Sequence, residues 1–223
     1  MRKITAIQVQ KKNPNRVNIS LDDEFAFGLS RIVAAWLSVG QVLSDEKIAA
    51  LQVQDAREVA YQKAMRFLGY RARSVSEVRE NLRKHEIPEA VIDEVLGRLQ
   101  EANLLNDREF AQAWVENRST FRPRSRRALA LELRKKGLDD EVVRDVLEAK
   151  VDENTLALQA ARKYLRKVEK LEWPEFRQKL GSFLGRRGFS YDVIIPVVRQ
   201  VWDEMHDVDG GRLIDDNEDV TWT

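Results

Sequence analysis

Arginines and lysines near the ends of expected helices are the residues of this 223-residue chain that could do chemistry. That chemistry is the binding of phosphate or carboxylate groups. Between positions 118 and 136, eight basic residues accompany a single acid, Glu132. Smaller basic groups occur before and after this segment. The candidate contact residues are Arg71, Arg73, Arg118, Arg122, Arg124, Arg126, Arg127, Arg134, Lys135, Lys136, Arg186 and Arg187.

Whether a basic group lies at the start or at the end of its helix decides how strongly it indicates binding of an anion. Arg134 to Lys136 and the pair Arg186-Arg187 fall at helix ends, where a cation also complements the helix dipole. Stabilisation of the helix therefore explains these residues as well as anion binding does. The four arginines between 122 and 127 fall at a helix start, where the dipole disfavours cations. We interpret them as contacts to a polyanion.

Residues for other chemistries are missing from the sequence. The chain has no cysteine, and its two histidines, His85 and His206, have no partner at the spacing of metal ligands. Its ten glycines fall at turns and helix ends rather than in a phosphate-binding loop, and no serine stands in a nucleophile elbow. We therefore expect no enzyme activity, no cofactor and no metal. With neither a signal peptide nor a long apolar run, a cytoplasmic location is expected.

The elements that must position these cations are repeated along the chain. The same apolar side chains recur in steps of 51 residues, and a period of this size indicates stacked supersecondary units. Capping signals, such as Ser74 with Glu77 and the single residues Asp139 and Ser190, divide each copy into three helices. The equivalent apolar positions are Val78, Leu129 and Leu180; Leu82, Leu133 and Leu184; and Ile87, Leu138 and Phe189.

These patterns predict a mainly α-helical protein with three tandem three-helix repeats, at residues 55–105, 106–153 and 154–206. Charged residues make up 34% of the chain, above the proportion in average soluble domains, which favours an elongated array with much surface. Residues 1–54 are expected to form a small β-meander with linking helices. Residues 207–223 are expected to be a disordered acidic tail.

The N-terminal segment differs from the repeats in its period. Residues 3–28 alternate apolar and polar side chains around two polar breaks, at 13–15 and 22–23, which predicts a three-stranded antiparallel meander. So small a sheet needs a packing partner. Lysines on its strands could form a second anion-binding surface, although lysine is also common on strand edges as a solubilising residue.

The next segment is expected to supply the packing partner of the sheet. Its apolar stripe predicts a helix that ends at Gly40, and Ser44 predicts the cap of a further helix. That second helix either continues past Asp55 or breaks there. The residues of the stripe are Ile32, Val33, Trp36 and Leu37.

The net charge of +1 hides a separation of charge along the chain. Basic residues dominate positions 118–136, whereas positions 203–219 hold eight acids against Arg212 alone. A mid-chain basic segment with an acidic tail suggests that the tail competes with polyanions for the basic segment. The alternative is a solvated helix face and an unstructured end.

Three motifs occur in order along the repeats: Arg71-x-Arg73-Ser74-x-x-Glu77-Val78-x-x-x-Leu82, Asn106-Asp107-x-x-Phe110-Ala111 with Arg118, and Glu132-Leu133-x-x-Lys136-Gly137-Leu138. At these motifs the sequence resembles the RecX family, and the resemblance covers positions 56–205. The N-terminal sheet resembles an extension carried by a subset of that family. The sequence departs from the family pattern at Ser125, where glycine is frequent, and at Ala128, where a basic residue is frequent.

The resemblance implies a curved, elongated array that lies in the groove of the filament formed by the recombinase RecA on single-stranded DNA. It implies inhibition of filament growth, of ATP hydrolysis, of strand exchange and of the co-protease activity in repressor cleavage. The implied partners are therefore RecA and single-stranded DNA, with weak binding to duplex DNA, no membrane contact and a monomeric state.

Two other classes of function remain open from the residues alone. An autonomous helix-turn-helix regulator would read duplex bases, but the expected helix starts carry few Asn or Gln side chains for base readout. A helical scaffold that binds only protein would show no salt-sensitive DNA binding. An enzyme is the least favoured class.

Overall fold

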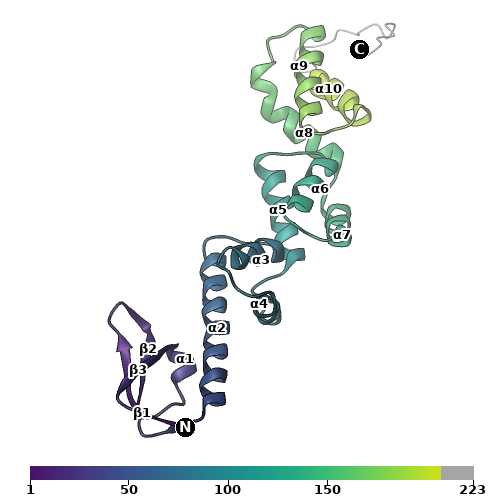
Figure 1. Cartoon of the computed structure of the whole chain (residues 1–223). Coiled ribbons are helices and arrows are strands. Elements are labelled where there is room, and N and C mark those ends of the chain that lie inside the picture. The colour runs from purple at the N-terminus through teal and green to yellow at the C-terminus, as the bar shows by residue number, and fades with distance from the viewer. Residues whose placement is uncertain (207–223) are drawn as a thin grey trace. The chain divides into compact units, whose positions relative to one another are not determined.

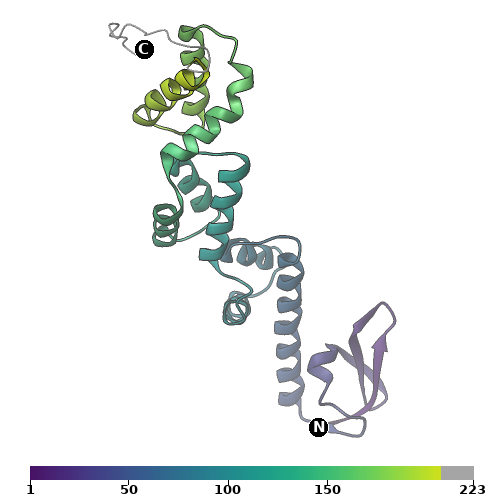
Figure 2. The same ribbon diagram turned by 180° about the vertical axis from the view of Figure 1, so that it is seen from behind.

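The computed structural model describes residues 1–206 of the chain, which divide into two compact units at Asp107 and Arg108. Figures 1 and 2 show the elements from two opposite sides. The strands are β1 (Arg2–Gln10), β2 (Asn13–Leu21), β3 (Glu24–Ser30) and β4 (Val42–Leu43). The helices are α1 (Arg31–Ala34), α2 (Asp45–Leu68), α3 (Val75–Arg83), α4 (Glu89–Glu101), α5 (Asp107–Phe121), α6 (Arg126–Lys135), α7 (Asp140–Lys150), α8 (Glu153–Tyr164), α9 (Trp173–Arg186) and α10 (Tyr191–His206), with a 3-10 turn at Leu165–Lys167.

The N-terminal strands form the predicted antiparallel meander, in the order β3-β2-β1-β4. In its register Ile19 pairs with Ile7 on one side and with Phe27 on the other. Alternate side chains, such as Ile4, Ile19 and Leu29, are fully buried, as the period of two requires. The structure adds β4, a two-residue strand that pairs with Arg2 and Lys3 and was not predicted.

The first hairpin turns earlier than the sequence pattern predicted. The turn lies at Lys11 and Lys12, so the prediction of a turn at residues 13–15 is wrong, and Pro14 lies within β2. The residues Gln10 and Asn13 pair next to a register shift in β1. Proline is tolerated there because, at the irregular end of a hairpin, its missing N–H removes no regular ladder hydrogen bond.

The helix predicted from the stripe after β3 is also wrong in its extent. Helix α1 ends at Ala34, and only Val33 of the stripe is buried, whereas Trp36 is 91% exposed. The chain instead turns back, and Gly40, at φ +95°, donates its N–H to the Ile4 carbonyl. This return places β4 beside β1, so hydrogen bonding at the sheet edge replaces the helical continuation.

Helix α2 joins the sheet to the first three-helix module and runs unbroken past Asp55. Ser44 caps it by accepting from Lys47 N–H, and Leu43 and Ile48 pack in the same apolar cluster, as a hydrophobic staple does. Figures 1 and 2 both show α2 beside the sheet. Its second half supplies Ala60 and Ala64 to a separate core with α3 and α4.

The three-helix organisation of the repeats is confirmed. Two of the expected caps are present, because Ser74 forms a complete capping box with Glu77 and Asp139 accepts from Glu141 N–H. Ser125 also caps a helix, by accepting from Ala128 N–H. The 51-residue register also appears in burial, because two sets of equivalent side chains are fully buried. These are Val78, Leu129 and Leu180, and Leu82, Leu133 and Leu184.

The second module (α5 to α7) and the third module (α8 to α10) share one apolar core within the second unit. Trp173 and Pro174 begin α9, and Pro196 lies inside α10. The prediction of a disordered tail concerns residues 207–223, which lie outside the described residues. The module boundaries given above remain predictions. Within residues 1–206, no helix combines the length and apolar character needed to cross a membrane.

Candidate functional site

The basic cluster of the second unit is centred on one carboxylate, that of Glu132 on α6. We define this cluster as Arg118, Arg122, Arg124, Lys136 and Arg187. Glu132 Oε2 accepts from Arg118 Nε at 2.7 Å, and Glu132 Oε1 lies 3.2 Å from Arg124 Nη1. The Glu132 side chain is only 16% exposed, so its carboxylate is largely shielded from water, whereas the Arg124 side chain is 44% exposed.

Trp114 on α5 forms the base of the cluster. Its indole Nε1 donates to Glu132 Oε2 at 2.9 Å, and its ring stacks on Phe110, with 5.8 Å between centroids. The Arg118 guanidinium lies over the Trp114 ring at 4.6 Å, and Lys136 Nζ lies 5.2 Å from the ring centroid. Trp114 is half-buried and hydrogen-bonded within the cluster, whereas Phe110 is buried in the apolar core of the second unit.

Arg187, at the end of α9, comes from the third module and completes the cluster. Its Nη1 donates to the Pro123 carbonyl at 2.9 Å, and its own carbonyl accepts from Ser125 N–H at 3.2 Å. The guanidinium lies over the Phe183 ring at 4.6 Å. Two modules thus contribute arginines to one surface.

The arginines of the cluster are close enough to repel one another. The pKa of Arg187 is lowered, first by burial and then by the positive charges of Arg124 and Arg122. The Arg122 side chain has no hydrogen bond or ion pair with any of residues 1–206. An anion placed beside these three guanidinium groups would relieve the repulsion, so the site is suited to phosphate or carboxylate groups.

Gly188 fixes the approach of the third module to this site. It adopts φ +92°, and a Cβ there would lie 2.6 Å from Ser125 Oγ and 3.1 Å from Ala128 Cβ. The two positions that depart from the RecX pattern, Ser125 and Ala128, therefore both lie against Gly188. Such a close approach explains why a small residue is required at position 188.

The remaining candidate residues of α6 and α9 do not all join the cluster. Arg126 Nη2 donates to the Val151 carbonyl at 2.7 Å and so holds the end of α7, while Arg134 pairs with Asp140 at 2.6 Å. Three more are exposed and have no ion pair among residues 1–206: Arg127, Lys135 and Arg186.

A groove of about 1060 Å³ lies on another part of the second unit, between α6 and α7 on one side and α9 and α10 on the other. Arg126, Arg127, Arg134 and Arg144 line it together with Glu148. Three of the predicted contact arginines, Arg126, Arg127 and Arg134, therefore border this groove and are not members of the basic cluster.

Two of the candidate residues, Arg71 and Arg73, belong to the first unit. Arg71 forms a two-pronged pair with Glu77, at 3.1 and 2.9 Å. Arg73 lies over the Phe67 ring at 3.9 Å, its Nε is buried with no partner among residues 1–206, and burial lowers the pKa of its guanidinium. Both arginines flank the cap of α3 at Ser74.

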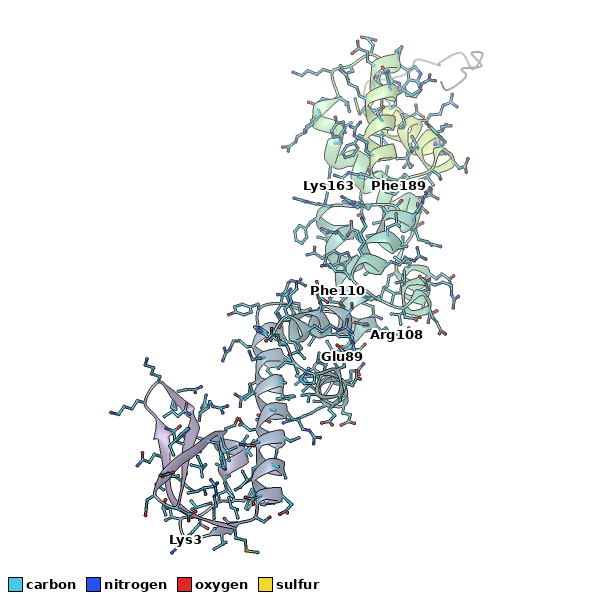
Figure 3. All side chains as sticks on the ribbon, in the orientation of Figure 1. Lys3, Glu89, Arg108, Phe110, Lys163 and Phe189 are labelled. Atoms are coloured by element: carbon cyan, nitrogen blue, oxygen red, sulfur yellow. The ribbon has the colours of Figure 1, made fainter. Side chains whose placement is uncertain are left out.

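Sequence reasoning missed two participants in the site. Glu132 was counted only as the one acid in a basic segment, although its position one turn before Lys136 was visible. Lys163 on α8 donates from Nζ to the Thr120 carbonyl and so adds a cation beside the end of α5 (Figure 3). No sequence signal marked Lys163, because its neighbour lies 43 residues away. No group of side chains suited to a metal ion occurs within residues 1–206.

The fold and the site together define a class of protein. It is a helical-repeat protein in which a small N-terminal sheet is followed along the chain by tandem three-helix modules, with arginines clustered on the helical surface. Models of the RecX family match all four parts. The regulatory protein RecX N-terminal domain matches residues 2–44, and the first, second and third three-helix domains match residues 60–99, 106–147 and 152–198. The chain belongs to the RecX family of regulatory proteins.

Relatives and solved structures agree with this membership. The chain is 38% identical to the regulatory protein RecX of Bacillus subtilis, over 89% of this chain and 76% of the relative, and 37% identical to that of Bacillus velezensis, over 88% and 76%. A crystal structure of a regulatory protein RecX has a TM-score of 0.71 and 26% identity, covering 90% of this chain and all of the other. RecX from Lactobacillus salivarius gives 0.59 and 27%, covering 66% and 97%.

Proposed function

We propose that this protein is a negative regulator of the recombinase RecA, which binds the filament that RecA forms on single-stranded DNA. Binding would inhibit filament extension, ATP hydrolysis, strand exchange and the co-protease activity of the filament. Membership of the RecX family supports a role in regulating RecA. The proposed mechanism is occupation of the filament by a protein that performs no chemistry of its own.

One observation carries the DNA-binding part of this proposal. Arg122, Arg124 and Arg187 come together from two modules, and their mutual repulsion is not neutralised by Glu132 alone. A phosphate backbone carries negative charges at regular intervals and fits such a surface better than a single small anion does. The proposal therefore assigns the basic cluster to phosphates of single-stranded DNA.

The function is tested by measuring RecA ATPase activity on single-stranded DNA with this protein added below the RecA concentration. Inhibition at a substoichiometric ratio is expected, because a regulator that stops filament growth acts on many RecA subunits at once. The double substitution Arg122→Ala with Arg124→Ala should weaken the inhibition while helical content stays unchanged. Arg57→Ala, which removes an exposed partner of Glu94, is the matched control and should inhibit as the wild type does.

Salt titration tests the phosphate contacts directly. Each lost contact to single-stranded DNA should flatten the log–log salt dependence of affinity by about 0.7, so the double variant should lose about 1.4. A protein that leaves the RecA ATPase unchanged and prefers particular duplex sequences would contradict the proposal and favour a helix-turn-helix regulator. Salt-independent binding to RecA alone would favour a protein scaffold.

A further inference from the structure

The first and second modules share a short motif that the basic cluster does not explain. It consists of an aromatic residue, an arginine, any residue, a second arginine and a capping serine. The two copies stand 51 residues apart, in the register of the repeat. They are Tyr70-Arg71-Ala72-Arg73-Ser74 and Phe121-Arg122-Pro123-Arg124-Ser125.

The aromatic residue of each copy lies on the surface. Tyr70 is 78% exposed and Phe121 is 69% exposed, and neither belongs to an apolar core. Neither ring contacts another ring or a cation among residues 1–206. Single exposed aromatic side chains are common, but two rings exposed at equivalent positions of successive repeats, each beside a pair of arginines, form a repeated surface feature that a partner can contact.

The arginines beside these rings are held in place by acids of their own module. Arg71 is fixed by its two contacts to Glu77, and Arg124 by its contact to Glu132. Arg122 remains without a partner among residues 1–206. Each motif thus presents one exposed ring together with one arginine that an acid of the same module holds, Arg71 in the first copy and Arg124 in the second.

The third module lacks the motif at the equivalent positions of the repeat. One further step of 51 residues leads from Phe121 to Glu172 and from Arg124 to Glu175. Its nearby aromatic residue, Trp173, packs against Phe176 and Trp202 instead of facing solvent. The third module therefore lacks the motif and carries acids at the equivalent positions. Acids repel phosphates, so we expect the motif to bind only in the first two modules.

We propose that Tyr70 and Phe121 stack on unpaired bases of single-stranded DNA while the adjacent arginines contact the flanking phosphates. Each of the first two modules then provides one equivalent site for a strand. Stacking on aromatic rings accepts any base and requires an accessible base face, which a duplex does not offer. This inference rests on the proposed function and deepens it, because it separates contacts to bases from contacts to phosphates.

The test uses the full-length protein with Tyr70→Leu and Phe121→Leu, singly and together, since leucine keeps an apolar side chain and removes only the flat ring. Affinity is measured for an oligothymidine strand, for an abasic strand of the same length and for a duplex. Trp36→Leu is the matched control, because Trp36 is 91% exposed and has no Arg-x-Arg beside it.

Each single substitution should weaken binding to oligothymidine by about 5- to 150-fold, with an unchanged salt slope. The wild type should bind the abasic strand about as weakly as the double variant binds oligothymidine, because both stacking contacts are then absent, and the variants should lose nothing further on that strand. Duplex binding and the Trp36→Leu control should remain as in the wild type.

Aromatic variants that bind oligothymidine like the wild type would overturn the stacking. If the aromatic variants bind normally but Arg122→Ala with Arg124→Ala still flattens the salt slope, the proposed function stands and only the stacking is rejected. Aromatic variants that bind DNA normally but fail to inhibit the RecA ATPase would also overturn it, because the rings would then contact protein. A wild type that binds no single-stranded DNA would overturn both.

Discussion

At Glu132, one carboxylate accepts from the indole of Trp114 and pairs with Arg118 and Arg124. Its charge holds two cations of the basic cluster in place, but it neutralises only part of their charge. The same residue therefore contributes both to the stability of the second module and to the orientation of the arginines. Removing its charge separates these two effects.

Glu132→Gln should lower the free energy of unfolding by about 1–3 kcal/mol, because hydrogen bonds to a charged acceptor are replaced by weaker ones. Affinity for single-stranded DNA should not fall, since the cluster gains one net positive charge. Urea denaturation followed by tryptophan fluorescence measures the stability. Glu116→Gln makes the same charge change on the exposed face of α5 and is the control. An unchanged unfolding midpoint in Glu132→Gln would contradict this role.

At the scale of elements, single polar or backbone contacts decide how helices and strands are joined. Asp55 on α2 is buried and accepts from Ser30 N–H and Ser30 Oγ, both at 2.6 Å, while its other oxygen pairs with Arg16 at 2.8 Å. These contacts tie β2 and β3 to the middle of α2. Because the sheet is small and has a small apolar core of its own, these polar contacts to α2 contribute to its stability.

Asp55→Asn should therefore lower the stability of the first unit by about 2–3 kcal/mol, because Arg16 is left partly buried without its counter-charge. Thermal unfolding followed by circular dichroism tests this. Glu94→Gln is the matched control, since its pair with Arg57 is half exposed and should contribute less than about 1 kcal/mol. Equal effects of the two substitutions would show that burial does not strengthen the Asp55 contacts.

A second element-scale prediction concerns the end of α9. Gly188→Ala combines a positive φ with a Cβ only 2.6 Å from Ser125 Oγ, so it should cost more than about 1 kcal/mol. The control is Gly97→Ala within α4, where an added Cβ meets nothing within 4 Å and should stabilise by about 0.5–1 kcal/mol. Chemical denaturation of both variants gives the comparison, and a neutral Gly188→Ala would contradict the close approach.

At the scale of the whole molecule, the charges of separate segments add up to determine how strongly the protein attracts a polyanion. The chain carries a net charge of +1, but positions 207–223 hold six acids and Arg212. Removing them would raise the net charge of the remaining chain to about +6, by subtraction of −5 from +1. A more positive protein attracts a polyanion more strongly at low ionic strength.

Deletion of residues 207–223 should therefore tighten binding to single-stranded DNA at low salt. The difference from the full chain should shrink as added salt screens the charges, with a Debye length of about 3 Å at 1 M. Fluorescence anisotropy across a salt series measures both. A variant that replaces the six acids with amides should behave like the deletion. Equal affinity of the full and shortened chains at low salt would reject competition by the tail.

Local rules written in the sequence determined the repeat and its caps. The 51-residue spacing identified Leu82, Leu133 and Leu184 as equivalent core positions because helix faces bury every third or fourth residue regardless of distant partners. The caps at Ser74 and Asp139 followed from groups within three residues of each helix start.

Only the tertiary structure decided which cations meet and which aromatic rings stay exposed. Arg187 joins Arg122 and Arg124 because the end of α9 contacts the segment before α6, and Arg187 and Pro123 lie 64 positions apart, a contact that no periodicity encodes. Trp36 faces solvent because pairing of β4 with β1 overrode the helical pattern around it. Burial and long-range pairing depend on the whole fold, whereas capping and periodicity depend on neighbours along the chain.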